Sequence, residues 1–169
     1  MSRFDPGALV AALVDGGVDF LVVGGFAVVA HGFERATGDV DIVPSPNRQN
    51  LERLEATLHA IDARVLGAGD FDQHEMPLDL TVDNLQLLGN WRLETRFGVL
   101  DLLQSVGQIV DGQGQYDELN ARAVRAHFAG REVLIVGYED LLAMKVIAGR
   151  DQDMIDIRAL REANDDTAP

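Results

Sequence analysis

Cysteine is absent from this 169-residue sequence, and basic residues are scarce. Without cysteine the chain has no disulfide, no thiolate nucleophile and no cysteine-ligated zinc or iron–sulfur centre. Fourteen Lys and Arg stand against 28 Asp and Glu, which gives a formal net charge of −14. Because a grip on duplex nucleic acid needs clustered Lys and Arg, this balance argues against non-specific DNA binding. It also disfavours docking on anionic membranes.

Long apolar runs are missing as well. The longest run, Phe20 to Ala30, is interrupted by Gly24-Gly25, whereas a membrane-spanning helix needs about 20 apolar residues. Near the N-terminus, Asp5, Asp15 and Asp19 would break the apolar core of a signal peptide. We therefore expect a cytoplasmic protein without a membrane partner.

The remaining composition is that of an ordinary globular protein. Apolar residues make up 47% of the chain and charged residues 25%, which favours a packed core over disorder. The length fits one domain. We expect this domain to span residues 1–163, followed by a frayed polar tail over 164–169.

Short apolar strands and amphipathic helices are interleaved along the chain. The expected strands are 20–23, 40–43, 64–66, 91–95, 98–103 and 133–136, with a hairpin turn across Arg96-Phe97. Helices are expected from residue 6 to the glycines at 16–17 and over 26–31, 51–61, 139–148 and 152–161. Asn47 gives no evident cap, Ile155 and Leu160 are expected to face inward, and residues 67–90 give no clear pattern. The order favours an α/β or α+β domain with a mixed sheet and flanking helices.

A glycine pair marks the end of the first expected strand. Gly24-Gly25 would turn this buried strand into a helix, which leaves backbone N–H groups at the positive end of the helix dipole. Glycine also lets the backbone approach an anion closely. By itself this turn is weak evidence for phosphate binding, since most such turns are simply tight turns.

Three carboxylates lie on expected strands. Asp39 and Asp41 are two residues apart, so the strand period points both side chains to one face. Two adjacent carboxylates repel each other unless a cation lies between them. The alternative is a pair of solvated acids at a strand edge, but the apolar residues Val40, Ile42 and Val43 indicate that the opposite face is buried.

The third acid, Asp101, lies in the centre of the apolar segment Val99–Leu103. A buried carboxylate without a partner is unfavourable, so it requires a metal ion or an arginine. Both partners remain open at this point. Three carboxylates from two strands form the oxygen-rich ligand set that Mg²⁺ or Mn²⁺ prefers, with substrate phosphates completing the coordination.

Together these residues resemble a known family. The pattern Gly24-Gly25-x-Ala27-x3-His31-Gly32-x2-Arg35-x-Thr37-x-Asp39-x-Asp41 resembles the signature of the nucleotidyltransferase superfamily with the DNA polymerase β-like fold. The segment Leu141–Leu160 is similar to the closing motif of the bacterial abortive-infection toxin branch. The resemblance covers both ends of the chain and the Asp101 strand, and it is thinnest over residues 67–90.

The resemblance implies a nucleotide site at the glycine turn. Gly24 and Gly25 would line the triphosphate, and Arg35 and Thr37 would steady the following loop or contact a phosphate. Lys145, the only lysine in the chain, would contact the phosphates from the C-terminal helical region. The alternative for Lys145 is a packed stem with the ammonium group in solvent.

The resemblance also implies a metal site. Asp39, Asp41 and Asp101 would bind Mg²⁺ or Mn²⁺, and Asp101 would act as the general base for an incoming hydroxyl. Relatives usually carry Pro-Lys where this chain has Asp151-Gln152. That departure weakens phosphate binding or moves the task to Arg150.

The implied activity is transfer of a nucleoside monophosphate from a nucleoside triphosphate to an acceptor hydroxyl. A toxin of a toxin–antitoxin or phage-defence system would use a tRNA or a protein as acceptor, and its partner would be a cognate antitoxin or a second copy of the chain. One alternative is a small-molecule (antibiotic) nucleotidyltransferase. Another is a catalytically silent nucleotide-binding or partner-binding module. Sequence alone leaves the acceptor and the preferred nucleotide open.

Overall fold

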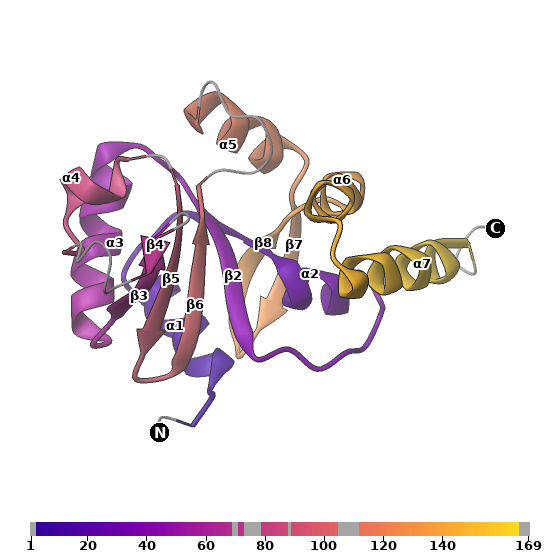
Figure 1. Ribbon diagram of the computed structural model, residues 1–169, viewed down its shortest axis with the longest axis horizontal. Coiled ribbons are helices and arrows are strands. Elements are labelled where there is room, and N and C mark those ends of the chain that lie inside the picture. The colour runs from indigo at the N-terminus through magenta and orange to yellow at the C-terminus, as the bar shows by residue number, and fades with distance from the viewer. Residues whose placement is uncertain (1–2, 69–70, 73–78, 88, 105–111, 166–169) are drawn as a thin grey trace.

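One mixed β-sheet forms the centre of the structure (Figure 1). The computed structural model describes residues 3–68, 71–72, 79–87, 89–104 and 112–165. Its strands are β1 (Phe20–Val23), β2 (Asp39–Pro44), β3 (Arg64–Ala68), β4 (Phe71–Asp72), β5 (Asn90–Thr95), β6 (Gly98–Leu103), β7 (Val124–Phe128) and β8 (Arg131–Ile135). Within the described ranges they make an eight-stranded sheet in the order β4-β3-β5-β6-β2-β1-β8-β7.

Helices flank this sheet. Those in the described part of the chain are α1 (Pro6–Asp15), α2 (Gly24–Ala30), α3 (Arg48–Ala60), α4 (Val82–Leu85), α5 (Gly112–Ala121), α6 (Tyr138–Ala148) and α7 (Asp151–Asp165). In Figure 1, α3 and α4 lie beside β3 and β5, whereas α6 and α7 pack together near α2. No helix in the described ranges combines the length and apolar character needed to cross a bilayer.

Both strand orientations occur in the sheet. β1 pairs antiparallel with β2 and parallel with β8, and β2 pairs parallel with β6. A mixed sheet with flanking helices is the fold class expected from the sequence, and that prediction is confirmed.

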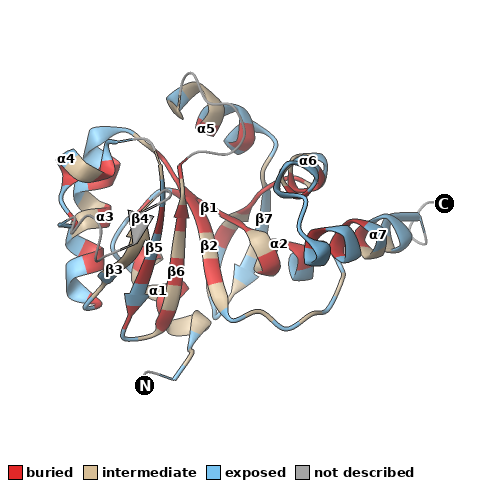
Figure 2. Cartoon of the chain, in the orientation of Figure 1, coloured by how far each residue is buried: buried red, intermediate tan, exposed pale blue. Residues whose placement is uncertain are grey.

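The central strands carry the core (Figure 2). All four residues of β1 are buried, and this strand lies inside the sheet between β2 and β8. In β2, Val40 and Ile42 are fully buried while Asp39 and Asp41 are only partly covered. This alternation confirms that the two carboxylates share the face opposite the apolar side chains.

Two local expectations are wrong. Asn47 caps α3, because its side chain accepts a hydrogen bond from the backbone N–H of Asn50 at 2.9 Å. Ile155 is 55% exposed, whereas Ile157 and Leu160 are buried. The inward positions of α7 also include two acids, so apolar residues alone misplace the buried face.

Several short elements were not expected from the sequence. They are α4, α5, β4 and β7. Helix α7 also continues to Asp165, two residues into the segment expected to fray, and residues 166–169 lie outside the described residues. Trp91 of β5 is buried, at 3% exposure, and His31 Nε2 lies 2.8 Å from the carbonyl oxygen of Val136.

Candidate active site

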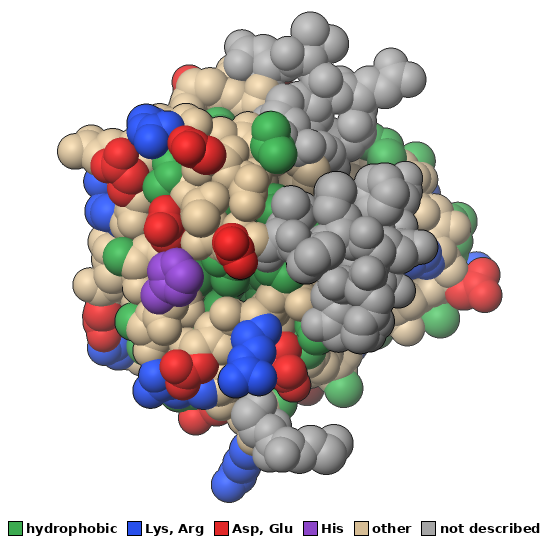
Figure 3. Space-filling view, turned by 60° about the vertical axis from the view of Figure 1, so that its left-hand side comes forward, with side chains coloured by type: hydrophobic (Ala, Val, Ile, Leu, Met, Phe, Trp, Pro, Cys, Tyr) green, Lys and Arg blue, Asp and Glu red, His purple; other side chains and the backbone are tan. Residues whose placement is uncertain are grey.

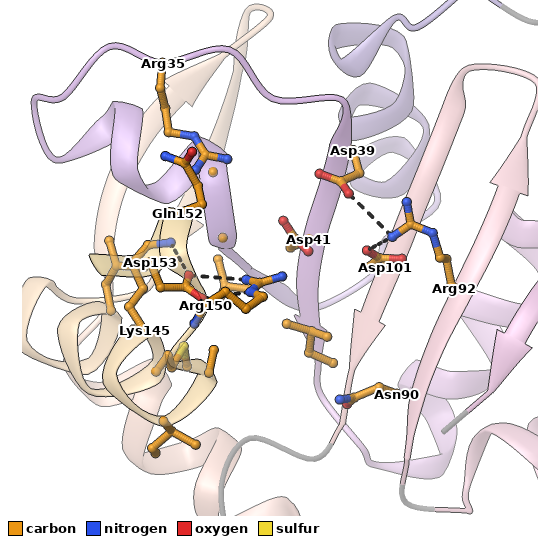
Figure 4. A pocket seen from close by; sticks show the side chains of 18 residues that line it. Arg35, Asp39, Asp41, Asn90, Arg92, Asp101, Lys145, Arg150, Gln152 and Asp153 are labelled. Carbon is orange, nitrogen blue, oxygen red and sulfur yellow. Dashed lines mark hydrogen bonds and ion pairs between the residues drawn. The ribbon is translucent and has the colours of Figure 1, made fainter. Parts of the chain in front are cut away.

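A cavity of about 580 Å³ lies between the sheet and the α6–α7 pair. Its lining includes nearly all the residues singled out from the sequence: Gly24, Gly25, Arg35, Asp39, Asp41, Asp101 and Lys145. In Figure 4 the acids of β2 and β6 form one wall, and side chains from α6, α7 and the turn between them form the other. Two regions far apart in the sequence therefore meet here, as the resemblance requires.

The glycine pair allows a carboxylate to lie against the start of α2. Gly24 has a φ of 62°, and a Cβ at this position would overlap the carboxylate of Asp41. A Cβ at Gly25 would come within 2.8 Å of Thr37 Oγ1. The Gly25 backbone N–H donates a hydrogen bond to the Asp41 carboxyl. Any side chain at these two positions would therefore push Asp41 or Thr37 out of place.

Strand register brings the three acids together. β2 and β6 run parallel with Asp41 directly opposite Asp101, and Asp39 lies two residues earlier on the same face of β2. The Asp39 and Asp101 side chains are 31% and 15% exposed. The carboxylates are thus crowded at one end of the cavity and only partly hydrated.

This crowding perturbs their protonation. Burial, followed by the charges of Asp39 and Asp101, raises the pKa of Asp41 to about 7, against weaker lowering by the Gly25 N–H and Arg150. Burial also raises the pKa of Asp101 to about 6, although the Arg92 guanidinium acts in the opposite direction. Acids with raised pKa values in a cavity mark a candidate functional site.

Arg92, a residue of β5, supplies the positive charge that is present. Its Nη1 lies 2.7 Å from Asp101 Oδ2 and 3.5 Å from Asp39 Oδ2. Figure 4 shows the guanidinium between these two carboxylates. The arginine partner considered for Asp101 is therefore present, and it contacts a second acid as well.

The donor set suits a divalent cation, but its present spacing does not. In the described ranges no group of three or more His, Cys, Asp or Glu side chains is arranged to hold a metal ion. Asp101 Oδ1 is nevertheless buried without a hydrogen-bond partner, and three carboxylates in one cavity are the ligand type that Mg²⁺ and Mn²⁺ prefer. The chemistry of these donors therefore fits a divalent cation.

Lys145 lies on the opposite wall in a buried ion-pair network. Its Nζ is 3.1 Å from Asp153 Oδ1 and 2.7 Å from Asp156 Oδ2, and the residue is only 4% exposed. A packed stem with a solvated ammonium, the alternative considered for this lysine, is therefore wrong. Burial alone would raise the pKa values of Asp153 and Asp156, but hydrogen bonds from Lys145 and neighbouring donors lower both.

Arg150 is the more accessible cation on this wall. Its Nε lies 2.7 Å from Asp153 Oδ2, yet the side chain is 75% exposed. It lines the cavity, and its charge lowers the pKa of Asp41. In Figure 4 the guanidinium extends toward the acids of β2. A positive group thus faces the carboxylates next to Asp151-Gln152, the position where the sequence lacks the expected lysine.

The loop between α2 and β2 is tied down at both of its singled-out positions. Arg35 Nη1 lies 2.8 Å from Asp156 Oδ2, which links the loop to α7. Thr37 Oγ1 lies 3.1 Å from the carbonyl oxygen of Asp39 and 3.3 Å from its Oδ1. These contacts hold the loop before β2 at both positions.

Arg92, Asp153 and Asp156 were not assigned a role from the sequence. A signal for Arg92 was available, because a hairpin turning across Arg96-Phe97 places residue 92 opposite residue 101. For Asp153 and Asp156 the signal is their three-residue spacing on a helix that follows a lysine-bearing helix. Neither signal alone identifies a site.

Solved nucleotidyltransferases share this fold. The crystal structure of the lincosamide antibiotic adenylyltransferase LnuA with lincomycin aligns with a TM-score of 0.59 and 15% identity, over 96% of this chain and 99% of that one. ANT(2")-Ia in complex with adenylyl-2"-tobramycin aligns at 0.58 and 16%, over 92% and 87%. An antigenic nucleotidyltransferase-like protein from Paracoccidioides brasiliensis aligns at 0.53 and 18%, over 91% and 72%. No protein-family model and no curated protein matches the sequence.

At these identities the likeness establishes the fold. The chain has the fold of nucleotidyltransferases, as its motifs predict, and it spans almost the full length of LnuA. What the chain does follows from its own cavity.

Proposed function

We propose that this protein is a metal-dependent nucleotidyltransferase that moves a nucleoside monophosphate from a nucleoside triphosphate to an acceptor hydroxyl. One observation carries the proposal: Asp39, Asp41 and Asp101 share a cavity with the Gly24-Gly25 turn. The fold shared with solved nucleotidyltransferases supports it.

Each wall of the cavity has its own part in the proposed reaction. Bound Mg²⁺ or Mn²⁺ would offset phosphate charge and lower the pKa of the attacking hydroxyl. On the sheet side, Asp39, Asp41 and Asp101 would hold the metal, and Asp101 would accept the proton of the acceptor hydroxyl. The Gly24-Gly25 turn would leave room for the phosphates beside Asp41.

The α6–α7 wall would offset the charge of the triphosphate. Arg150 is exposed toward the acids and would contact the phosphates directly. Lys145 borders the cavity but already forms ion pairs with Asp153 and Asp156. Its ammonium group would have to bind a phosphate in addition to these two carboxylates.

A small hydroxylated molecule is the second, more specific proposal for the acceptor. The cavity volume of about 580 Å³ falls within the usual range for small-molecule sites. LnuA and ANT(2")-Ia act on, or are solved with, antibiotics of that kind. The net charge of −14 also suits a cationic acceptor better than a polyanionic tRNA. The toxin role rests on the motif resemblance alone, so the test must include tRNA and protein acceptors.

The test is transfer of label from α-labelled nucleoside triphosphates. The protein is incubated with each triphosphate, Mg²⁺ or Mn²⁺, and a panel of aminoglycosides, lincosamides, tRNA and a protein extract. We expect labelled acceptor and released pyrophosphate, and we expect a chelator to abolish both. Asp41→Asn should also abolish transfer, whereas Asp62→Asn, which changes an exposed acid paired with Arg96, should not.

Nucleotide binding without transfer to any acceptor would favour the silent module instead. Equal triphosphate affinity with and without a chelator would contradict the metal dependence. Label on tRNA or protein, with none on the small molecules, would favour the toxin role.

A further inference from the structure

Arg92 lies against the carboxylates that are proposed to bind Mg²⁺ or Mn²⁺. It extends from β5 toward β6, directly opposite Asp101 in the antiparallel register. One nitrogen, Nη1, contacts both Asp101 Oδ2 at 2.7 Å and Asp39 Oδ2 at 3.5 Å. A single guanidinium thus holds acids from two different strands, as Figure 4 shows.

The two partners in the Arg92–Asp101 ion pair differ in their exposure to solvent. The Arg92 side chain is 52% exposed, whereas that of Asp101 is 15% exposed. Because Arg92 is already half exposed, water can replace the carboxylates as acceptors for its donors when it leaves them. Arg92 would therefore be well hydrated after moving into solvent. Asp39 and Asp101 would then lose their counter-ion while still crowded beside Asp41.

Arg92 and a divalent cation compete for the same oxygen atoms. A guanidinium hydrogen-bonds carboxylates at about 2.7–2.9 Å, whereas Mg²⁺ requires oxygens at about 2.0–2.1 Å in a near-octahedral arrangement. Two positive groups would also repel each other across one carboxylate. Both cations would need the same Asp39 and Asp101 oxygens, so they cannot hold them at the same time.

We propose that Arg92 is a resident counter-ion of the carboxylate cluster, which holds Asp39 and Asp101 in the metal-free protein and must leave them when a divalent cation binds. This inference rests on the proposed metal-dependent function. Its consequence is that Arg92 lowers the affinity for metal and, in the same way, stabilises the metal-free fold.

Mn²⁺ binding to the nucleotide-free, full-length protein tests this proposal. Calorimetry or electron paramagnetic resonance gives the affinity for wild type, Arg92→Ala and Arg92→Lys. We expect Arg92→Ala to bind Mn²⁺ at least about tenfold more tightly than wild type, because a charged hydrogen bond no longer has to break. Arg92→Lys should be intermediate, since lysine keeps the charge but lacks the planar fork.

Arg125→Ala is the matched control. Arg125 is also a strand arginine in an ion pair, with Glu132 at 3.0 Å, and it does not line the cavity. Its removal changes the net charge equally but leaves the acids untouched, so its Mn²⁺ affinity should stay within about twofold of wild type. In a chelator, Arg92→Ala should melt below Arg125→Ala, and saturating Mn²⁺ should remove that difference.

Three results would overturn the inference. Equal Mn²⁺ affinity of Arg92→Ala, Arg125→Ala and wild type would show no competition, and with transfer intact only this inference would fail. Weaker binding by Arg92→Ala would mean that Arg92 positions the acids for the metal. Absence of Mn²⁺ binding in all variants would overturn both the inference and the metal dependence proposed above.

Discussion

The surroundings of Asp41 disfavour its ionised form. Its neighbours Asp39 and Asp101 are acids. The Gly24 backbone also packs so closely against Asp41 that a Cβ at residue 24 would overlap the carboxylate. Its pKa is raised from 3.8 to about 7, first by burial and then by these two charges. In the unfolded chain the group ionises near its ordinary value, so folding takes up a proton between these two pH values.

Linkage therefore predicts a pH dependence for the metal-free protein. The stability that protonated Asp41 contributes is present below its unfolded pKa and is lost as the pH rises through about 7. Each unit of raised pKa corresponds to roughly 1.4 kcal/mol. In a chelator, we expect Asp41→Asn to be more stable than wild type at about pH 8 and to lose that advantage near pH 4. Urea unfolding measures both, and parallel stability profiles for the two proteins would contradict the raised pKa.

Lys145 has a structural role in addition to any contact with substrate. The sequence-based hypothesis for this residue is at least tenfold weaker nucleotide binding in Lys145→Ala, about 1.4 kcal/mol, with little loss of stability. Its burial between Asp153 and Asp156 changes the second half of that expectation.

We expect Lys145→Ala to lower the free energy of unfolding by about 3 kcal/mol, because two buried carboxylates lose a shared partner. The loss should stay near this lower end because Arg150 and Arg35 still contact Asp153 and Asp156. Urea unfolding measures the loss, with Arg158→Ala on the exposed face of α7 as the control. A Lys145→Ala variant as stable as this control would show that the ion pairs contribute nothing.

At the scale of elements, Arg35 connects the loop before β2 with α7. Its ion pair with Asp156 spans 121 residues of sequence, and Lys145 of α6 holds the same carboxylate. Three segments therefore meet at one buried acid. This meeting point positions the loop that carries Thr37 toward the cavity.

Arg35→Ala separates the two roles that the resemblance leaves open. If Arg35 steadies the loop, hydrogen exchange of residues 33–38 should speed up in the nucleotide-free protein, since a long-range tether is lost. Asp156 should stay in place because Lys145 still pairs with it. Exchange measured by mass spectrometry decides: unchanged protection together with weaker nucleotide binding would identify Arg35 as a phosphate contact instead.

How far the sequence predicts these elements depends on local signals. The β5–β6 hairpin, β1 and β2 have strong apolar patterns of strand length, and each was expected near its observed position. Helix α5 has two glycines and few apolar residues, and β7 is a half-exposed strand at the edge of the sheet. Neither element has a clear hydrophobic periodicity in its sequence. Both depend on contacts with neighbours distant in the sequence, which local patterns do not show.

The candidate site shows the same limit. The glycine turn and the three acids lie in or beside sequence motifs, so the sequence alone predicts that they converge. The ion pairs of Lys145 could not be predicted, because its partners are set by the packing of two helices rather than by a local pattern. For Arg92, the expected hairpin register did place it opposite Asp101, but that position alone did not single it out. The wrong prediction that Ile155 faces inward on α7 has the same explanation. Asp153 and Asp156 take the buried positions because cations from other segments pair with them.

At the scale of the whole molecule, the acidic surplus is distributed rather than confined to the cavity. Acidic and basic side chains are intermixed on the face shown in Figure 3. Exposed ion pairs such as Arg48–Asp83 also link α3 and α4. The net charge of −14 still produces a long-range negative field, which attracts cations and opposes polyanions.

This field predicts how salt acts on the proposed reaction. Between about 0.01 and 1 M salt the screening length falls from about 30 Å to about 3 Å, so attraction between the protein and a distant cationic acceptor is lost. If the acceptor is a polycationic small molecule, its KM should rise by about tenfold or more over this range, whereas the KM of an uncharged acceptor of similar size should change little. Steady-state kinetics with saturating metal and triphosphate measures both values. Equal salt dependence for the two acceptors would mean that local contacts in the cavity, rather than the charge of the whole chain, select the acceptor.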